Sequence, residues 1–380
     1  MESFTKILTE GLRYVLAVLM FLFSPVTALT GLLRPAPAPQ PLKLGAYYWD
    51  GWYERIPAWT DRLLDEFADR EPVWGWQNGD IAGMELQIGL AADNGLSFFA
   101  FDWYYPETYE NPMNEAVDRF LASSNRGRME FCLLVANHGG FLIYPETWPD
   151  AVARFLPYLT SERALKVDGK PVIIFFSSGE LEKCLGGEKE VKKSLDALRA
   201  ACVEAGLEGC YVMACTNAER YRGGDVSPIF FDWSVSALKY RAMGYDAVTG
   251  YNYHRSTQPD GAFEYPFKRL NADYELTWNM QGKYSLVPYM PVLNGGWDCR
   301  PWESGGGDPN RSCYSPDRTP EDFCSHVRAA AKWTRENPRA SAGGLAIFYA
   351  WNEMGEGGYL VPNIGEGDAV LKAIGRAMAE

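Results

Sequence analysis

The feature that most constrains the fold is a regular alternation of short apolar runs with amphipathic stretches along most of the 380 residues. Eight runs are rich in β-branched and aromatic residues, which is typical of buried strands. They are Lys43–Trp49, Leu96–Tyr104, Glu130–Asn137, Val172–Ser177, Cys210–Thr216, Ala247–Tyr253, Ser285–Leu293 and Leu345–Asn352.

The segments between these runs have the pattern of amphipathic helices. In Asp80–Asn94, for example, Met84, Ile88 and Ala91 share one face. Near-continuous apolar strands separated by helices indicate a parallel sheet that is covered on both faces. Eight such units predict an α/β fold, a single (β/α)8 TIM barrel, and a doubly wound open sheet is the alternative. The other predicted helices are Pro112–Ser123, Pro149–Thr160, Glu188–Ala205, Trp233–Met243, Tyr265–Met280, Pro320–Asn337 and Gly367–Ala379.

The N-terminus has a different pattern. Lysine and arginine precede an apolar run from Val15 to Phe23, and the small residue Ala28 follows. This order predicts a secretory signal peptide over residues 1–28, cleaved after Ala28. The alternative is an uncleaved anchor that continues to about Leu33, although Pro25 interrupts its second half.

The segment after the signal is rich in Pro and Ala. Residues 29–41 therefore predict a stiff linker, and residues 42–380 predict one catalytic domain without a composition break. With either reading of the N-terminus we expect a secreted or periplasmic protein, tethered to a membrane if the apolar segment is retained.

The charge balance excludes several function classes. The formal net charge is −13, so nucleic-acid binding is not expected.

The eight cysteines form no C-x-x-C pair, and no H-E-x-x-H or other metal-ligand spacing occurs. We therefore predict no cofactor and no metal site. Disulfide pairing and oligomeric state stay open, and Cys132, inside an apolar run, is expected to be a buried free thiol.

Aromatic, acidic and amide residues gather at the C-terminal ends of the predicted strands. In a barrel these ends surround the active site. Aromatic rings stack on sugar faces, and carboxyl and amide groups bind sugar hydroxyls, so the combination predicts a carbohydrate partner, an oligo- or polysaccharide. The predicted substrate-binding residues are Tyr47, Trp49, Asp50, Asp102, Trp103, Asn137, His138, Tyr251, Tyr253, Trp297, Asp298, Trp351 and Asn352.

Each of these residues also has a structural interpretation. A tyrosine or tryptophan at a strand end often packs in the core. Asp50 and Asp102 could cap helices, and His138 could be a satisfied structural group. The functional interpretation depends on their joint position at one end of the same barrel.

The sharpest signal is the pair Glu353 and Glu356 in the stretch Ala350–Gly357, directly after the last apolar run. Glycoside cleavage uses paired carboxyls, one as proton donor to the leaving oxygen and one to activate a nucleophile. Like charges held close together also raise one pKa, which suits a general acid near neutral pH. The pair is therefore predicted to be catalytic.

The stretch Trp351–Gly357, with the following Tyr359–Pro362, Gly367 and Leu371, resembles the end of the glycoside hydrolase family 99-like, WbsX-type barrels. That family carries a W-N-E-W-x-E-G pattern; here Met stands at the second Trp, and Gly replaces the His or Ala often found next. The opening Gly45–Trp49, the second strand and the stretch around Gly250 to Tyr253 are also similar.

The resemblance implies an exported, endo-acting, retaining glycosidase of the α-mannan-cleaving kind. By motif position, Glu353 would be the base for the sugar 2-hydroxyl, which forms a 1,2-anhydro sugar, and Glu356 the general acid/base. Two other functions stay open. One is a non-catalytic carbohydrate-binding barrel. The other is a glycosyltransferase of polysaccharide biosynthesis, although the chain has no D-x-D and no phosphate-binding glycine motif.

Overall fold

The structure is a computed structural model that describes residues 37–52, 60–77, 79–106, 113–216, 238–254, 262–302 and 313–380. The predicted signal peptide or anchor, and most of the predicted linker, lie outside these residues. Among the described helices, none is long and apolar enough to cross a membrane.

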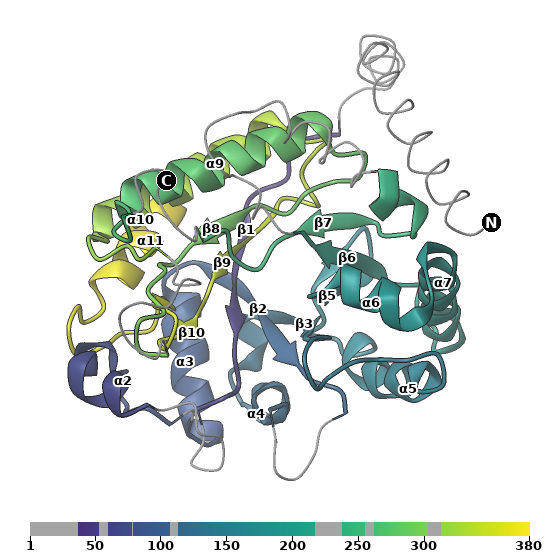
Figure 1. Cartoon of the computed structure of the whole chain (residues 1–380), viewed down its shortest axis with the longest axis horizontal. Helices are drawn as coiled ribbons and strands as arrows, with labels where there is room; N and C mark the ends of the chain where they lie inside the picture. Colours follow the sequence, from purple (N-terminus) through teal and green to yellow (C-terminus); the bar gives the residue numbers. More distant parts are fainter. Residues whose placement is uncertain are drawn as a thin grey trace.

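Eight parallel strands form a closed barrel, with helices around the outside (Figure 1). The order of neighbours is β7-β6-β5-β3-β2-β1-β9-β8. The two ends of this order meet because Val248 N donates to Pro288 O and Met290 N donates to Val248 O, each at 2.9 Å. The predicted TIM barrel is therefore confirmed, and the open sheet is excluded. The strands are β1 (Lys43–Tyr48), β2 (Leu96–Trp103), β3 (Glu130–Val135), β5 (Lys170–Phe175), β6 (Tyr211–Cys215), β7 (Ala247–Thr249), β8 (Val292–Asn294) and β9 (Leu345–Tyr349).

The seventh strand begins later than predicted. Within the predicted run Ser285–Leu293, Pro288 and Pro291 have no backbone N–H to donate, so a continuous ladder cannot form there. Tyr289, between the two prolines, makes isolated bridges to Val248 and Ser341. The regular strand starts only after Pro291, at Val292.

The helices cover the barrel, with α9, α10 and α11 on one side and α5, α6 and α7 on the opposite side (Figure 1). The periodicity did not predict α6. Ser177 begins it by accepting a hydrogen bond from Glu180 N at 3.2 Å, and Gly186 ends it in a left-handed conformation. Of the predicted helix Trp233–Met243, only residues 238–242 are described as helical. The helices are α2 (Asp61–Glu66), α3 (Ile81–Asp93), α4 (Glu115–Ala122), α5 (Trp148–Leu159), α6 (Ser178–Leu185), α7 (Glu188–Glu204), α9 (Phe267–Tyr284), α10 (Pro320–Glu336) and α11 (Ala369–Met378).

Short elements complete the fold. Two of them matter for the site: η1 (Ala68–Arg70) follows α2, and the hairpin of β10 (Asn352–Glu353) and β11 (Gly358–Tyr359) follows β9. The others are η2 (Arg126–Arg128) and β4 (Lys166–Val167), which pairs with β5.

Most of the large aromatic residues are core. Tyr253 and Tyr289 join their hydroxyls at 2.9 Å, and Tyr47 donates to Gly250 O at 2.7 Å. A buried tyrosine needs such a partner for its hydroxyl, because an unpaired one would lose its hydrogen bonds with water. The predicted buried thiol, Cys132, lies on β3 and is free.

Candidate active site

The two glutamates lie on a tight hairpin directly after β9. Asn352 pairs with Tyr359 and Glu353 with Gly358, in antiparallel register. Glu356 N then donates to Glu353 O at 3.1 Å, which closes the turn. Both side chains therefore leave one turn and line the same cavity.

Glycines let aromatic rings approach this turn closely. A Cβ on Gly355 would lie 2.1 Å from the indole nitrogen of Trp302, and one on Gly358 would lie 2.3 Å from the Tyr349 ring. Gly357 has a φ of +76°, which glycine adopts without strain. The Gly-rich composition of the turn thus allows Trp302 and Tyr349 to pack against its backbone.

A cavity of about 790 Å³ opens at the C-terminal end of the barrel, within the size range of small-molecule sites. Two of its walls are aromatic. Trp49 and Trp302 have ring centroids 5.9 Å apart, and His254 stacks on Trp297 at 3.9 Å. Seven of the predicted site residues line it: Trp49, Asp102, His138, Tyr251, Trp297, Glu353 and Glu356.

Three carboxyl groups meet at one wall of this cavity, and tyrosine hydroxyls are their partners. Tyr251 Oη lies 2.6 Å from Glu353 Oε1 and 3.0 Å from Asp102 Oδ2. Tyr349 donates to Glu356 Oε2. The second oxygens, Glu353 Oε2 and Asp102 Oδ1, are buried and have no hydrogen-bond partner in the described part of the chain. Within the same residues, neither Glu353 nor Glu356 forms an ion pair with lysine or arginine.

This environment raises the pKa of all three carboxyl groups. Burial raises the pKa of Glu353 well above its ordinary value, and the charges of Glu356 and Asp102 raise it further, while the Tyr251 hydrogen bond opposes the shift. Burial also raises the pKa of Glu356 and of Asp102. Raised carboxyl pKa values in a cleft mark candidates for general acid–base work.

The two histidines of the cavity are neutral at physiological pH. Burial lowers the pKa of His254 to about 4. His138 is more exposed, and partial desolvation by the cavity wall lowers its pKa as well. Both imidazoles can therefore donate and accept hydrogen bonds without bringing a positive charge to the carboxyl groups.

Eight predicted substrate-binding residues do not line the cavity. For four of them the side-chain direction is the reason. Side chains alternate along a strand, so Trp103 points away from Asp102 and packs on Phe155 outside the barrel. Trp351 likewise donates to Gln87 on α3 at 2.8 Å. The other two, Tyr47 and Tyr253, are buried in the core, where their hydroxyls form the hydrogen bonds to Gly250 O and to Tyr289 described above.

Asn352 and Asn137 do not line the cavity, but each binds the backbone of a residue that does. Asn352 accepts from Trp49 N at 2.9 Å and donates to Trp49 O at 2.8 Å. Asn137 pairs in the same way with the backbone of Ser177, at 3.0 and 2.7 Å. An amide side chain can do this because it carries both a donor and an acceptor. Trp49 and Ser177, which these amides fix, do line the cavity.

The remaining two predicted residues are structural carboxylates. Asp50 accepts from Ala116 N at 2.6 Å, in the first turn of α4, as a helix-capping role requires. Asp298 binds the guanidinium groups of both Arg70 and Arg300. Its carboxylate is thereby occupied and buried, with 6% of the residue exposed.

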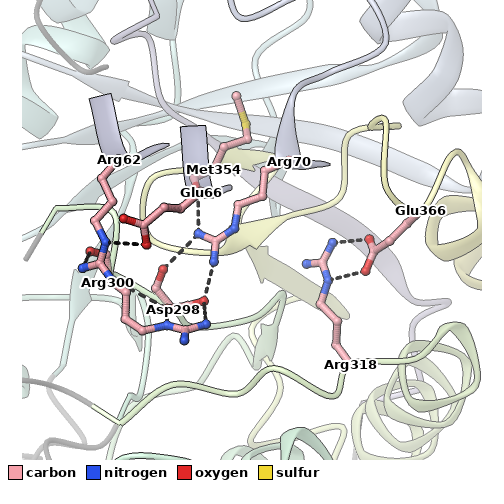
Figure 2. A network of polar contacts seen from close by, with 8 residues as sticks. All are labelled: Arg62, Glu66, Arg70, Asp298, Arg300, Arg318, Met354 and Glu366. Carbon is pink, nitrogen blue, oxygen red and sulfur yellow. Dashed lines mark hydrogen bonds and ion pairs between the residues drawn. The ribbon is translucent and has the colours of Figure 1, made fainter. Parts of the chain in front are cut away.

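Arg70, from η1, connects this ion pair to the turn that carries the two glutamates (Figure 2). Its Nη1 donates to Met354 O at 2.9 Å and to Asp298 O at 3.0 Å, while Nη2 binds the Asp298 carboxylate. Arg318 supports the other arm of the hairpin by donating to Tyr359 O at 3.0 Å, and it pairs with Glu366. The hairpin is thus held through its carbonyl oxygens.

The prediction missed several residues that line the cavity. Tyr104 and His254 lie at the C-terminal ends of predicted strands, so the criterion that selected their neighbours applies to them as well. Trp302 lies in the loop after β8, and Glu182 pairs with Lys239 at another wall. The sequence around Trp302, Glu182 and Lys239 does not distinguish these three residues from surface residues. Further lining residues are Phe141, Phe176, Ser178, Tyr240 and Asn252.

The described residues contain no group of three or more His, Cys, Asp and Glu side chains that could hold a metal ion. The side chains that line the cavity supply carboxyl groups, hydroxyls, imidazoles and aromatic faces.

Comparison with known proteins gives a family and a fold. The sequence profile of the family described as "Glycosyltransferase WbsX" matches residues 79–374, more than half of the chain. No curated protein matches. A structure titled "Glycoside hydrolase-like protein" is similar with a TM-score of 0.61 at 14% identity, covering 91% of this chain and 96% of the other. A GH99 endo-alpha-mannosidase from Bacteroides thetaiotaomicron gives 0.59 at 12% identity, covering 88% and 96%. At these identities the likeness shows the fold.

Replacing Arg70 should loosen the turn. Arg70→Met leaves Asp298 with one fewer guanidinium partner and removes the donor to Met354 O, so we expect a loss of about 3–5 kcal/mol in the free energy of unfolding. Urea denaturation measures it. The control is Arg328→Met, whose partner Glu380 is exposed, and it should leave the unfolding midpoint unchanged. Equal effects of the two variants would contradict the role given to Arg70.

The raised pKa of Glu353 makes stability depend on pH. Because the folded carboxyl binds its proton more tightly than the unfolded one, its contribution is present below the ordinary glutamate pKa and is lost as pH rises through the raised value. Glu353→Gln should therefore stabilise the protein at pH 8, by about 1.4 kcal/mol for each factor of ten by which folding tightens proton binding, with a smaller difference at pH 4. Denaturation curves at both pH values test this; a pH-independent difference would contradict it.

Proposed function

The chain belongs to the WbsX family, and we propose that it is a retaining glycoside hydrolase that cleaves an α-linked, mannan-like glycan internally. The observation that carries the proposal is the placement of Glu353 and Glu356 on one turn, facing an aromatic-lined cavity without a cationic partner in the described residues. Paired carboxyls in such a setting are what glycoside cleavage requires.

In this proposal Glu356 is the general acid/base. Burial raises its pKa, which favours the protonated form, and in this form it donates a proton to the oxygen of the leaving sugar. Glu353 is the base: its unpartnered Oε2 takes the proton of the sugar 2-hydroxyl. The 2-oxygen then bonds to the anomeric carbon as the glycosidic bond breaks, which gives a 1,2-anhydro sugar.

Water completes the cycle. Glu356, now a carboxylate, takes a proton from a water molecule that attacks the anomeric carbon, and Glu353 returns its proton to the 2-oxygen. The two inversions at the anomeric carbon give net retention. Both carboxyls end in their starting protonation states, so one water is consumed for each bond cleaved.

The substrate would lie against the aromatic walls. Trp49 and Trp302 on one side and Trp297 on the other offer ring faces for stacking on sugars. Asp102, His138 and Tyr251 offer acceptors and donors to hydroxyl groups.

The charge of the cavity favours a neutral glycan over the nucleotide sugar that many transferases use. Three carboxyl groups meet at one wall, and Lys239, which also lines the cavity, is already paired with Glu182. A diphosphate would be repelled by the ionised Glu353 and would find no unpaired lysine or arginine among the described lining residues. The family description still makes transfer the second candidate.

Export is part of the proposal and is supported by the order of charged, apolar and small residues at the N-terminus. We expect the mature protein to begin at Leu29. N-terminal sequencing of the protein recovered from outside the cytoplasm tests this, and an intact Met1 in a membrane fraction would favour the retained anchor.

Removing either glutamate should abolish cleavage without unfolding the protein. Glu353→Gln and Glu356→Gln are each expected to lose at least about 100-fold in kcat, the scale of acid–base assistance. The measurement is hydrolysis of a panel of α-linked oligosaccharides, with the anomer of the product read by NMR. Glu336→Gln, on the exposed face of α10, is the control and should keep full activity.

The panel separates the alternatives. Full activity in both glutamate variants would end the proposal. Binding without cleavage by the wild-type protein would indicate a carbohydrate-binding barrel, and sugar transfer from a nucleotide donor would indicate a glycosyltransferase.

A further inference from the structure

Tyr251 stands between two carboxyl groups, and it has one hydroxyl hydrogen to share. Its oxygen lies 2.6 Å from Glu353 Oε1 and 3.0 Å from Asp102 Oδ2. A phenol can donate to only one of them. If both contacts are hydrogen bonds, the second carboxyl must bring its own proton and donate to the tyrosine oxygen.

The hydroxyl of Tyr251 keeps its hydrogen. Burial raises the pKa of Tyr251 well above its ordinary value, and the charges of Asp102 and Glu353 raise it further. A tyrosinate beside two carboxyl groups is therefore excluded at neutral pH, and the extra proton belongs to Asp102 or Glu353.

The shorter of the two distances from the Tyr251 oxygen is typical of a charged acceptor, and the longer one is typical of a neutral pair. A hydroxyl donating to a carboxylate gives an oxygen–oxygen distance of about 2.5–2.7 Å, whereas neutral pairs extend to about 3.0 Å. The shorter contact is with Glu353. This geometry makes Glu353 the ionised acceptor and Asp102 the neutral donor.

We propose that Asp102 is held as a neutral carboxylic acid that donates to Tyr251, so that the Tyr251 proton goes to Glu353 and keeps that carboxylate ionised. Asp102 is then a positioning residue that acts on the base through Tyr251. The inference rests on the proposed function for its purpose, because a general base must be ionised, but the protonation order itself follows from the contacts.

The surroundings of Asp102 favour its neutral form. The residue is 4% exposed, and Oδ1 has no partner in the described residues. Burial is the largest cause of its raised pKa and outweighs the contact with the Tyr251 hydroxyl, which lowers it. A buried carboxyl kept neutral can serve as a hydrogen-bond donor. Among the described residues, the titratable groups that interact with Asp102 are Tyr104, Cys215, Tyr251, Glu353 and Glu356, none of them cationic.

The chain offers a matched control. Asp150 also accepts a tyrosine hydroxyl, from Tyr105 at 2.8 Å, but it is exposed and pairs with Arg154. Its pKa is lowered by the Tyr105 hydrogen bond and by Arg154. Comparing the two aspartates separates the effect of burial among carboxyls from the effect of a tyrosine partner.

The test is a carbon-13 NMR titration of the full folded protein labelled at the side-chain carboxyls of Asp and Glu, without any substrate. Asp102→Asn, Asp150→Asn and Glu353→Gln assign the three signals by their loss. At pH 7 we expect Asp102 neutral and Glu353 ionised. Asp102 should titrate well above the range of an ordinary exposed aspartate, and Asp150 below that range.

Tyr251→Phe supplies the second measurement, and it also assigns the Asp102 and Glu353 signals if either substitution prevents folding. Loss of its hydrogen bond should raise the titration midpoint of Glu353 by about one pH unit or more. An ionised Asp102 at pH 7, or a neutral Glu353 beside it, would overturn the proposal. Because no substrate is used, an absence of glycosidase activity would count against the proposed function and leave this result standing.

Discussion

The meeting of three carboxyl groups at one cavity wall, with no cation beside them in the described residues, is the constraint around which the end of the barrel is built. Asp102 and Glu353 are 4% and 5% exposed, so neither is solvated by bulk water. Burying an unpaired carboxylate costs several kcal/mol, and a protein reduces that cost by hydrogen bonding or by protonation. Here Tyr251 and Tyr349 provide the hydrogen bonds, and the raised pKa of Asp102 favours its protonated form.

The placement of arginines relative to the turn follows from this constraint. Arg70 and Arg318 bind carbonyl oxygens of the hairpin, at Met354 and Tyr359. Figure 2 shows Arg70 with Met354. Their charges are balanced by Asp298 and Glu366, and not by the glutamates of the turn. An arginine beside Glu356 would lower the pKa of that residue, which burial raises in this structure. Holding the turn through its backbone therefore fixes its geometry without placing a guanidinium group against either glutamate among the described residues.

The eight strands could be predicted because each leaves a local pattern, a short apolar run bounded by polar residues. The site could be predicted only in part, because a strand end says where a residue is along the barrel and not which way its side chain points. Asp102 and Trp103 show the difference: they are neighbours in sequence, and one lines the cavity while the other packs on Phe155. Applying the alternation of side chains to each strand end would have separated this pair.

Local sequence patterns do not predict contacts between segments that are distant in the sequence. Arg70 and Met354 are 284 residues apart, and the sequence near either residue does not predict their hydrogen bond. The same holds for Asn352, whose amide binds the backbone of Trp49. Asparagine at a strand end suits a sugar hydroxyl and a peptide group equally well, since it offers one donor and one acceptor to either. Residue chemistry alone therefore cannot distinguish a residue that contacts a substrate from one that positions such a residue, and that distinction requires the tertiary structure.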